Sequence, residues 1–197
     1  MHTVHPQLLA DLTRRFGMPR VLHWEVEIGP AEMEMVRASR RGWRSHDVTF
    51  FIIGPHALVA LIRKPSFPPG VWRAPSGGVN PGEDFVAGTT REAAEETGLD
   101  ITLERYLVRI HVTFRTPAGS QEPWVSHLFL ARTEGTRLLP RDHGEIAGAR
   151  WSTLEELTGP IRRRLLATGR GLFRYRALLH DAAYAALRGG PYPAPAE

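Results

Sequence analysis

The chain has 197 residues, 42% of them hydrophobic, so it can bury one sizeable core and is expected to form one compact domain with terminal appendages. It contains no cysteine, which excludes disulfides, thiolate metal sites and cysteine nucleophiles. The formal net charge of +4 comes from arginine, because Lys64 is the only lysine. Basic side chains are dispersed outside residues 162–164 and form no stripe with aromatic residues, so a nucleic-acid partner is not expected.

The N-terminus shows no basic segment followed by an apolar run, so no signal peptide is predicted. Apolar stretches fall short of the roughly 20 residues that span a bilayer. We therefore expect a cytoplasmic protein without a membrane partner.

The first part of the chain predicts one helix and three strands. Apolar residues recur at helical spacing over residues 9–16 and stop at Gly17, which is typical of a short helix. Residues 30–45 fit neither pattern, and residues 65–81 are rich in Pro and Gly and are expected to be largely irregular. Strands are predicted over residues 21–28, 48–53 and 58–62.

The second part predicts a central helix, further strands and C-terminal helices. Asp84 is a suitable N-cap and Gly98 a suitable stop for a helix over residues 85–97. Its small, buried face is expected to comprise Val86, Thr90, Ala93 and Thr97. Strands are predicted near 101–113, 125–131 and 149–151, and helices over 154–167 and 172–187. This order of elements predicts an α/β or α+β sandwich.

Three parts are expected along the chain. Residues 1–46 form an N-terminal helix and strand extension, residues 47–188 form the main domain, and residues 189–197 form a disordered tail rich in Gly and Pro.

Glu92, Glu95 and Glu96 are the most informative side chains. Their spacing places them on one face of the predicted helix. Like charges side by side cost free energy unless a cation lies between them, and hard divalent metals prefer carboxylate oxygens. A solvated acidic face paired with arginines is the alternative.

Residues 77–99 extend this triplet into a longer pattern. They read Gly-x5-Glu-x7-Arg-Glu-Ala-Ala-Glu-Glu-Thr-Gly-Leu, with Ala93 and Leu99 in two aliphatic positions. The pattern resembles the Nudix box at every specified position, and chance agreement is on the order of 10⁻⁷. Ser76 stands where many members of that family have Gly or Ala.

The resemblance implies a Nudix-like α/β/α sandwich around a mixed sheet, with added N-terminal and C-terminal helices. It also implies a hydrolase that uses Mg²⁺ or Mn²⁺ to cleave a pyrophosphate in a nucleoside diphosphate derivative. Metals neutralise the pyrophosphate and lower the pKa of a bound water, so the protein mainly contributes positioning and electrostatics.

The resemblance also assigns roles to single residues. Gly77, Glu83 and Gly98 shape the box, and Glu83 would brace its loop or contact metal through water. Arg91 is expected to pair with a box carboxylate. The metal ligands would be Glu92, Glu95, Glu96 and the backbone carbonyl of Ser76.

The general base is not fixed within the family. It could be a box glutamate, such as Glu92 or Glu95 assisted by Arg91, or an acid on a downstream loop. Glu145 is the candidate there, with Asp142 behind it.

Residues outside the box would choose the substrate. Arg73 and Arg115 could clamp phosphates, and Trp72 could stack on a base, although core packing is the alternative for the tryptophan. Pro117 lies near, but not at, the place of a proline typical of ADP-ribose and nucleotide-sugar pyrophosphatases. These features favour a small-molecule nucleotide substrate of that type, and residues 1–46 could be the dimerising arm of a homodimer.

Three alternatives stay open. The protein could be a house-cleaning pyrophosphatase for nucleoside triphosphates, a non-catalytic module that senses a nucleotide, or a hydrolase of RNA ends. The dispersed arginines do not favour the last, and the complete set of box glutamates argues for turnover.

Overall fold

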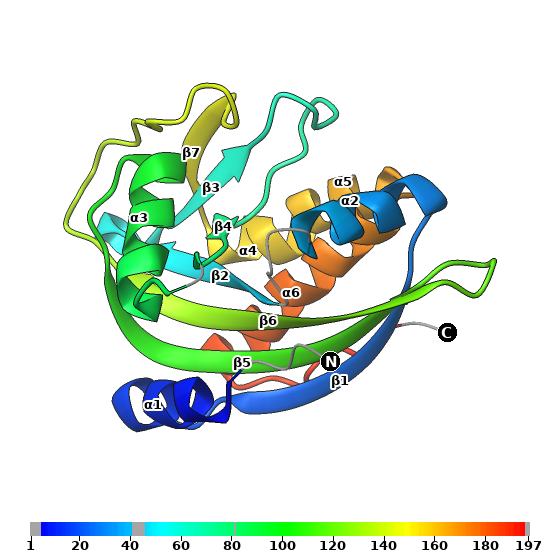
Figure 1. Ribbon diagram of the computed structural model, residues 1–197. Helices are drawn as coiled ribbons and strands as arrows, with labels where there is room; N and C mark the ends of the chain where they lie inside the picture. Colours follow the sequence, from blue (N-terminus) through cyan, green and yellow to red (C-terminus); the bar gives the residue numbers. More distant parts are fainter. Residues whose placement is uncertain (1–4, 41–45, 81, 196–197) are drawn as a thin grey trace.

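A mixed β-sheet runs through the computed structural model, which describes residues 5–40, 46–80 and 82–195 (Figure 1). Within these residues the sheet has seven strands in the order β1-β5-β6-β2-β3-β7, with β4 beside β2. β1 runs parallel to β5 and β2 parallel to β6, whereas the other pairs are antiparallel. The strands are β1 Arg20–Glu27, β2 His46–Ile53, β3 Val59–Arg63, β4 Ser76–Gly77, β5 Thr102–Arg115, β6 Gln121–Arg132 and β7 Gly148–Ser152.

Helices cover both faces of this sheet (Figure 1). Helices α1 and α3 contribute to the buried cluster on one face, and α2, α5 and α6 contribute to the cluster on the other. The α/β sandwich expected from the sequence is confirmed. The helices are α1 Pro6–Phe16, α2 Pro30–Arg40, η1 Pro55–Ala57, α3 Phe85–Thr97, α4 Leu154–Glu156, the π-helical η2 Leu157–Ile161, α5 Arg162–Ala167 and α6 Gly171–Arg188.

Strand β2 shows why the sheet is buried on both sides. Val48, Phe50 and Ile52 belong to the cluster beneath α1 and α3. Phe51 and Ile53 belong to the opposite cluster. Successive side chains point to opposite faces of a strand, so a continuous apolar run forms a strand with two buried faces.

The ambiguous stretch 30–45 contains helix α2, while residues 41–45 lie outside the described part. Glu32 ties this helix to the start of α6. Its carboxylate accepts hydrogen bonds from the backbone N–H groups of Gly29, Gly171 and Leu172 at 3.0, 3.1 and 3.0 Å. The first N–H groups of a helix lack partners within the helix, so this carboxylate caps α6 and fixes it beside α2.

Helix α3 has the predicted bounds. The Asp84 side chain accepts bonds from the N–H groups of Val86 and Ala87, both at 3.0 Å. Gly98 ends the helix at a φ of 75°, and a Cβ there would lie 2.1 Å from the Leu139 carbonyl oxygen. Both the conformation and the close approach therefore require glycine.

The predicted buried face of α3 is partly wrong. Val86 and Thr90 are only half-buried, whereas Phe85, Thr89 and Glu96 are buried. The helix packs its first residue, Phe85, against the sheet, which turns the buried face toward Glu96. One box carboxylate thus lies inside the protein.

The C-terminal region contains a break in one predicted helix and a contact of its tail with the core. A π-helical turn containing Pro160 interrupts the helix expected over residues 154–167. In the tail expected to be disordered, Tyr192 packs against the core and the Arg20 guanidinium lies 5.6 Å from the centre of its ring.

In the described ranges, no helix has the length and apolar character needed to cross a membrane.

Candidate active site

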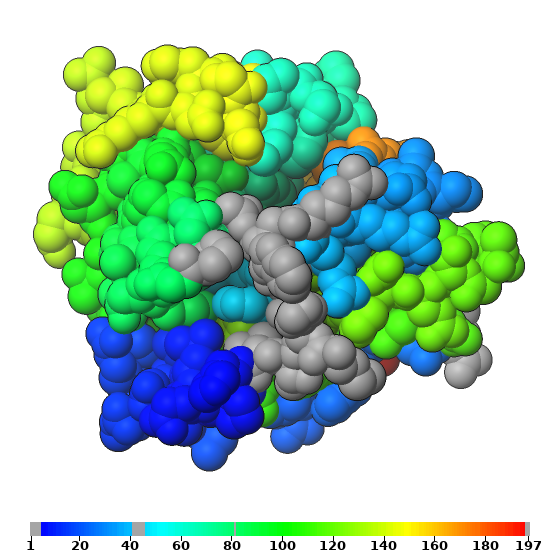
Figure 2. Space-filling view, viewed as in Figure 1, coloured from blue at the N-terminus to red at the C-terminus, as the bar shows by residue number. Residues whose placement is uncertain are grey.

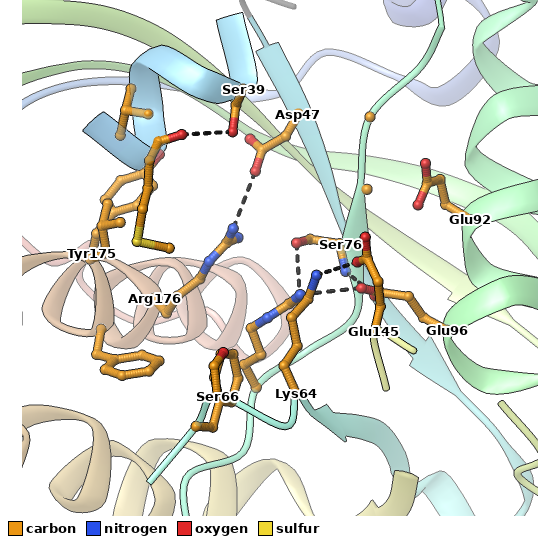
Figure 3. Close-up of a pocket in the computed structure, with 18 of the residues that line it drawn as sticks. Ser39, Asp47, Lys64, Ser66, Ser76, Glu92, Glu96, Glu145, Tyr175 and Arg176 are labelled. Atoms are coloured by element: carbon orange, nitrogen blue, oxygen red, sulfur yellow. Dashed lines mark hydrogen bonds and ion pairs between the residues drawn. The ribbon is translucent and has the colours of Figure 1, made fainter. Parts of the chain in front are cut away.

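A cleft of about 580 Å³ lies between α3 and the helices α2 and α6 (Figure 3). Its α3 side carries the acidic side chains of Glu92, Glu95 and Glu96. Its other side is lined by apolar groups of α2 and α6, by Arg176 of α6 and by Arg170, the residue before α6. The structure therefore brings the carboxylate triplet to a cavity large enough for a small molecule.

Arg91 holds the loop and helix of the box together. Its Nε and Nη2 donate to the two carboxylate oxygens of Glu83 at 2.9 and 3.0 Å. Its Nη1 donates to Glu92 and Glu95 at 3.1 and 3.0 Å, so the expected pairing with box carboxylates is present. Glu83 also accepts the N–H of Asn80 at 2.9 Å, which braces the loop. One guanidinium thus orients three carboxylates.

Glu96 has a different partner from the rest of the triplet. Its side chain is only 6% exposed and accepts a bond from Arg73 Nη2 at 3.2 Å. The backbone N–H of Ser76 donates to its other oxygen at 2.8 Å. Arg73 is itself buried and donates to Ser76 Oγ at 2.9 Å and to the Ala74 carbonyl at 2.8 Å. Glu96 and Arg73 therefore form a buried ion pair that ties α3 to the segment before the box.

Glu92 lies directly against the loop at Gly77. Burial raises the pKa of its carboxyl, and the charges of Glu96 and Glu95 act in the same direction while Arg91 opposes them. A Cβ on Gly77 would lie 2.2 Å from Glu92 Oε2. The glycine at the start of the box thus leaves the space that this carboxylate occupies.

Gly77→Ala tests this packing. We expect the added methyl group to displace the Glu92 carboxylate and to lower kcat by up to about a hundredfold, with the melting temperature nearly unchanged. Gly159→Ala is the matched control, because its added Cβ would meet nothing within 4 Å. Steady-state kinetics and thermal unfolding of both variants check this, and wild-type kcat in Gly77→Ala would contradict it.

The donor set of the box suits a hard divalent cation. Glu92, Glu95, Glu96 and the Ser76 carbonyl offer only oxygen ligands, which Mg²⁺ and Mn²⁺ prefer. Across the described ranges, no three His, Asp or Glu side chains form a ready-made metal cage. Arg91 and Arg73 hold these carboxylates instead. The all-oxygen chemistry of these groups therefore fits a hard divalent metal.

The two downstream acids line the same cleft. Glu145 Oε2 accepts a bond from Lys64 Nζ at 2.6 Å, so its charge is already compensated (Figure 3). Asp142 Oδ1 accepts the N–H groups of Gly144 and Glu145 at 3.0 and 2.9 Å, which shapes the loop. The loop lies over the end of α3 (Figure 2), where Arg141 N–H donates to the Glu95 carbonyl at 2.9 Å. Both acids stay candidates for the general base.

The structure does not bring two of the predicted substrate residues to this cleft. Trp72 lies under the guanidinium groups of Arg63 and Arg150, at 5.8 and 5.2 Å from the centre of its ring, on adjacent strands β3 and β7. Arg115 ends β5 and pairs with Glu25 of the neighbouring edge strand. Arg73 does line the cleft, but its guanidinium is committed to Glu96. A role of these residues in substrate binding stays a prediction.

Sequence reasoning missed the residues opposite the box. Asp47 of β2 and Arg176 of α6 line the cleft and form an ion pair at 3.5 Å. Asp47 precedes the apolar run of β2, and Arg176 lies beside Tyr175 on a mostly apolar helix. Neither position belongs to a recognisable motif, so only the packing of α6 across the sheet reveals them.

Comparison with known proteins agrees with the geometry. A family model described as the NUDIX domain matches residues 44–171. The chain belongs to the Nudix family. The matched segment contains the whole box, β2 to β7 and helices α3 to α5, whereas α1, β1, α2 and nearly all of α6 lie outside it.

Individual Nudix relatives match over part of their length. An RNA pyrophosphohydrolase of Caulobacter vibrioides (strain NA1000 / CB15N) is 31% identical over 104 residues, which cover 45% of this chain and 59% of that protein. The NAD-capped RNA hydrolase NudC of Stutzerimonas stutzeri (strain A1501) is 32% identical over 110 residues, covering 54% and 36%. The aligned segment thus covers 59% of the first curated relative and 36% of the second. A crystal structure of a UDP-X diphosphatase aligns with a TM-score of 0.53 at 16% identity, covering 80% of this chain and 71% of that one, which shows the shared fold.

Proposed function

We propose that the chain is a divalent-metal-dependent pyrophosphohydrolase that cleaves the pyrophosphate of a nucleoside diphosphate derivative. The observation that carries this proposal is a complete Nudix box whose three helix carboxylates line a cleft of about 580 Å³. Membership of the family and the pyrophosphohydrolase named among the relatives support it. A module that only senses a nucleotide would not need all three acids in the cavity.

Each part of the box has a role in this proposal. Glu92, Glu95, Glu96 and the Ser76 carbonyl would hold Mg²⁺ or Mn²⁺, which would neutralise the diphosphate and activate water. Arg91 orients Glu92 and Glu95 through its paired bonds. Arg73 donates to the Glu96 carboxylate and holds it in place. The proton from water would pass to a box glutamate or to Glu145, whose carboxylate lies in the same cleft.

ADP-ribose and nucleotide sugars are the substrates we favour. The support is the sequence near Pro117 and a cleft closed on one side by α2 and α6, which suits a small molecule. The 5′ end of an RNA is the second candidate, because both curated relatives described above act on RNA by name. The homodimer through residues 1–46 stays a separate prediction, which sedimentation of the whole chain can test.

A substrate panel with and without metal tests the function. We expect Mg²⁺-dependent release of a nucleoside monophosphate from ADP-ribose or a nucleotide sugar, and chelation by EDTA should abolish it because the carboxylates alone cannot neutralise a diphosphate. The panel adds nucleoside triphosphates, a 5′-triphosphorylated RNA and an NAD-capped RNA. Excess Mg²⁺ after EDTA is the control and should restore the rate. If no compound were hydrolysed with Mg²⁺ or Mn²⁺, the enzymatic proposal would be wrong.

A further inference from the structure

Helix α6 sends a charged side chain into the cleft opposite the box. Arg176 lies on α6, which extends beyond the family segment 44–171, and its guanidinium points toward Asp47 across the cavity (Figure 3). The side chain is 23% exposed, so it is neither a surface charge nor a fully enclosed one. It faces the same cavity as the acidic triplet.

Asp47 is fixed by the sheet more firmly than by Arg176. Its Oδ1 accepts hydrogen bonds from Trp124 Nε1 at 3.0 Å and from the Ser126 hydroxyl. Ser126 Oγ accepts in turn from the Tyr175 hydroxyl at 2.8 Å. The contact from Arg176 Nη2 to Asp47 Oδ2 is 3.5 Å, which is long for a charge-assisted bond. Asp47 therefore lies beside the Arg176 guanidinium but does not fully compensate its positive charge.

The positive charge of Arg176 is poorly compensated. Its other contact, from Nη1 to Thr49 Oγ1 at 3.2 Å, is to a neutral hydroxyl. Arg73 lines the same cavity. Burial and the charges of Arg176 and Arg73 together lower the pKa of His180 to about 3. Arg73 has Glu96 as a close partner, whereas Arg176 keeps unused donor capacity. A guanidinium group that lines a cavity without a close anionic partner attracts an anion.

We propose that Arg176 binds a phosphoryl oxygen of the substrate diphosphate, and that Asp47 positions its guanidinium. The inference rests on the proposed function and deepens it, because it adds a phosphate-binding residue from a helix outside the matched family segment. The box carboxylates would hold one side of the diphosphate through a metal ion, and Arg176 of α6 would bind the diphosphate from the opposite side of the cleft. A planar guanidinium can donate two parallel hydrogen bonds to phosphate oxygens. A lysine ammonium cannot match this geometry.

Binding measurements separate this role from catalysis. The probes are methylenediphosphonate and α,β-methylene-ADP, whose bridges cannot be hydrolysed, titrated calorimetrically at excess Mg²⁺. We expect Arg176→Gln to weaken the affinity for both by about tenfold to a hundredfold, as for the loss of a charged hydrogen bond. Arg176→Lys should lose less, because it keeps the charge. Arg188→Gln on the same helix is the control, since this exposed residue pairs with Glu155 outside the cleft, and its affinities should match wild type.

The results of these binding measurements either support or overturn the role of Arg176. Wild-type affinities in Arg176→Gln would overturn the inference, and a lowered melting temperature with unchanged affinities would overturn it in favour of a structural role. Neither result would affect the proposed function if the wild-type chain hydrolyses a member of the panel. A wild-type chain that binds neither probe and hydrolyses nothing would overturn the proposed function and this inference together.

Discussion

Replacing Glu96 by glutamine is expected to lower kcat by about a thousandfold and to destabilise the fold by about 3 kcal/mol. The loss of a metal-binding carboxylate removes several kcal/mol of transition-state stabilisation. The same change leaves Arg73 buried without its anion, and breaking a buried pair on one side costs about 3–5 kcal/mol. Steady-state kinetics and urea unfolding measure the two effects.

A second substitution, at Arg73, controls for the effect of Glu96→Gln on stability. Because glutamine leaves the charge of Arg73 uncompensated, the double variant Glu96→Gln/Arg73→Gln should recover part of the lost stability but none of the activity. Equal stability of Glu96→Gln and wild type would show that the buried pair contributes nothing. The burial of Glu96 beside Arg73 is what makes this substitution costly to the fold.

Replacing Glu92 by glutamine should give a comparable loss of kcat, about a thousandfold, with little loss of stability. Glu92 shares Arg91 with Glu83 and Glu95, so the guanidinium keeps anionic partners when this one charge is removed. The variant therefore isolates the chemistry better than Glu96→Gln does. Single-turnover kinetics at saturating Mg²⁺, together with thermal unfolding, would measure both quantities.

Glu104→Gln is the matched control for Glu92. Glu104 is an exposed strand residue that pairs with Arg132 away from the cleft, so its replacement should change neither kcat nor stability appreciably. If Glu92→Gln kept more than about a tenth of the wild-type kcat, Glu92 would not be a metal ligand of the kind the box implies.

Local patterns were enough to predict helix α3 and its ends. Asp84 supplies acceptors for the first N–H groups of the helix, and Gly98 takes a conformation that other residues resist. These constraints act within a few residues, so a single sequence reveals them. Strands β2 and β3 were also predicted from the sequence. A strand that is buried on both faces is a continuous apolar run, which can be recognised without knowing its neighbours in the sheet.

Contacts between distant segments could not be predicted in this way. Helix α2 was missed because it depends on Glu32 reaching the start of α6, far along the chain. Trp72 and Arg115 were assigned to the substrate on residue type, and the tertiary structure places both outside the lining of the cleft. Asp47 and Arg176 meet only because α6 packs across β2.

The sequence by itself determined the chemistry of one half of the site. The box spacing places three carboxylates on one helix and a glycine where Glu92 needs space, and these are short-range consequences of covalent geometry. The tertiary structure decided which carboxylate is buried, which arginine compensates it and what faces the box across the cleft. Those choices depend on packing between elements far apart in the chain, where burial and charge compensation, not local spacing, set the free energy.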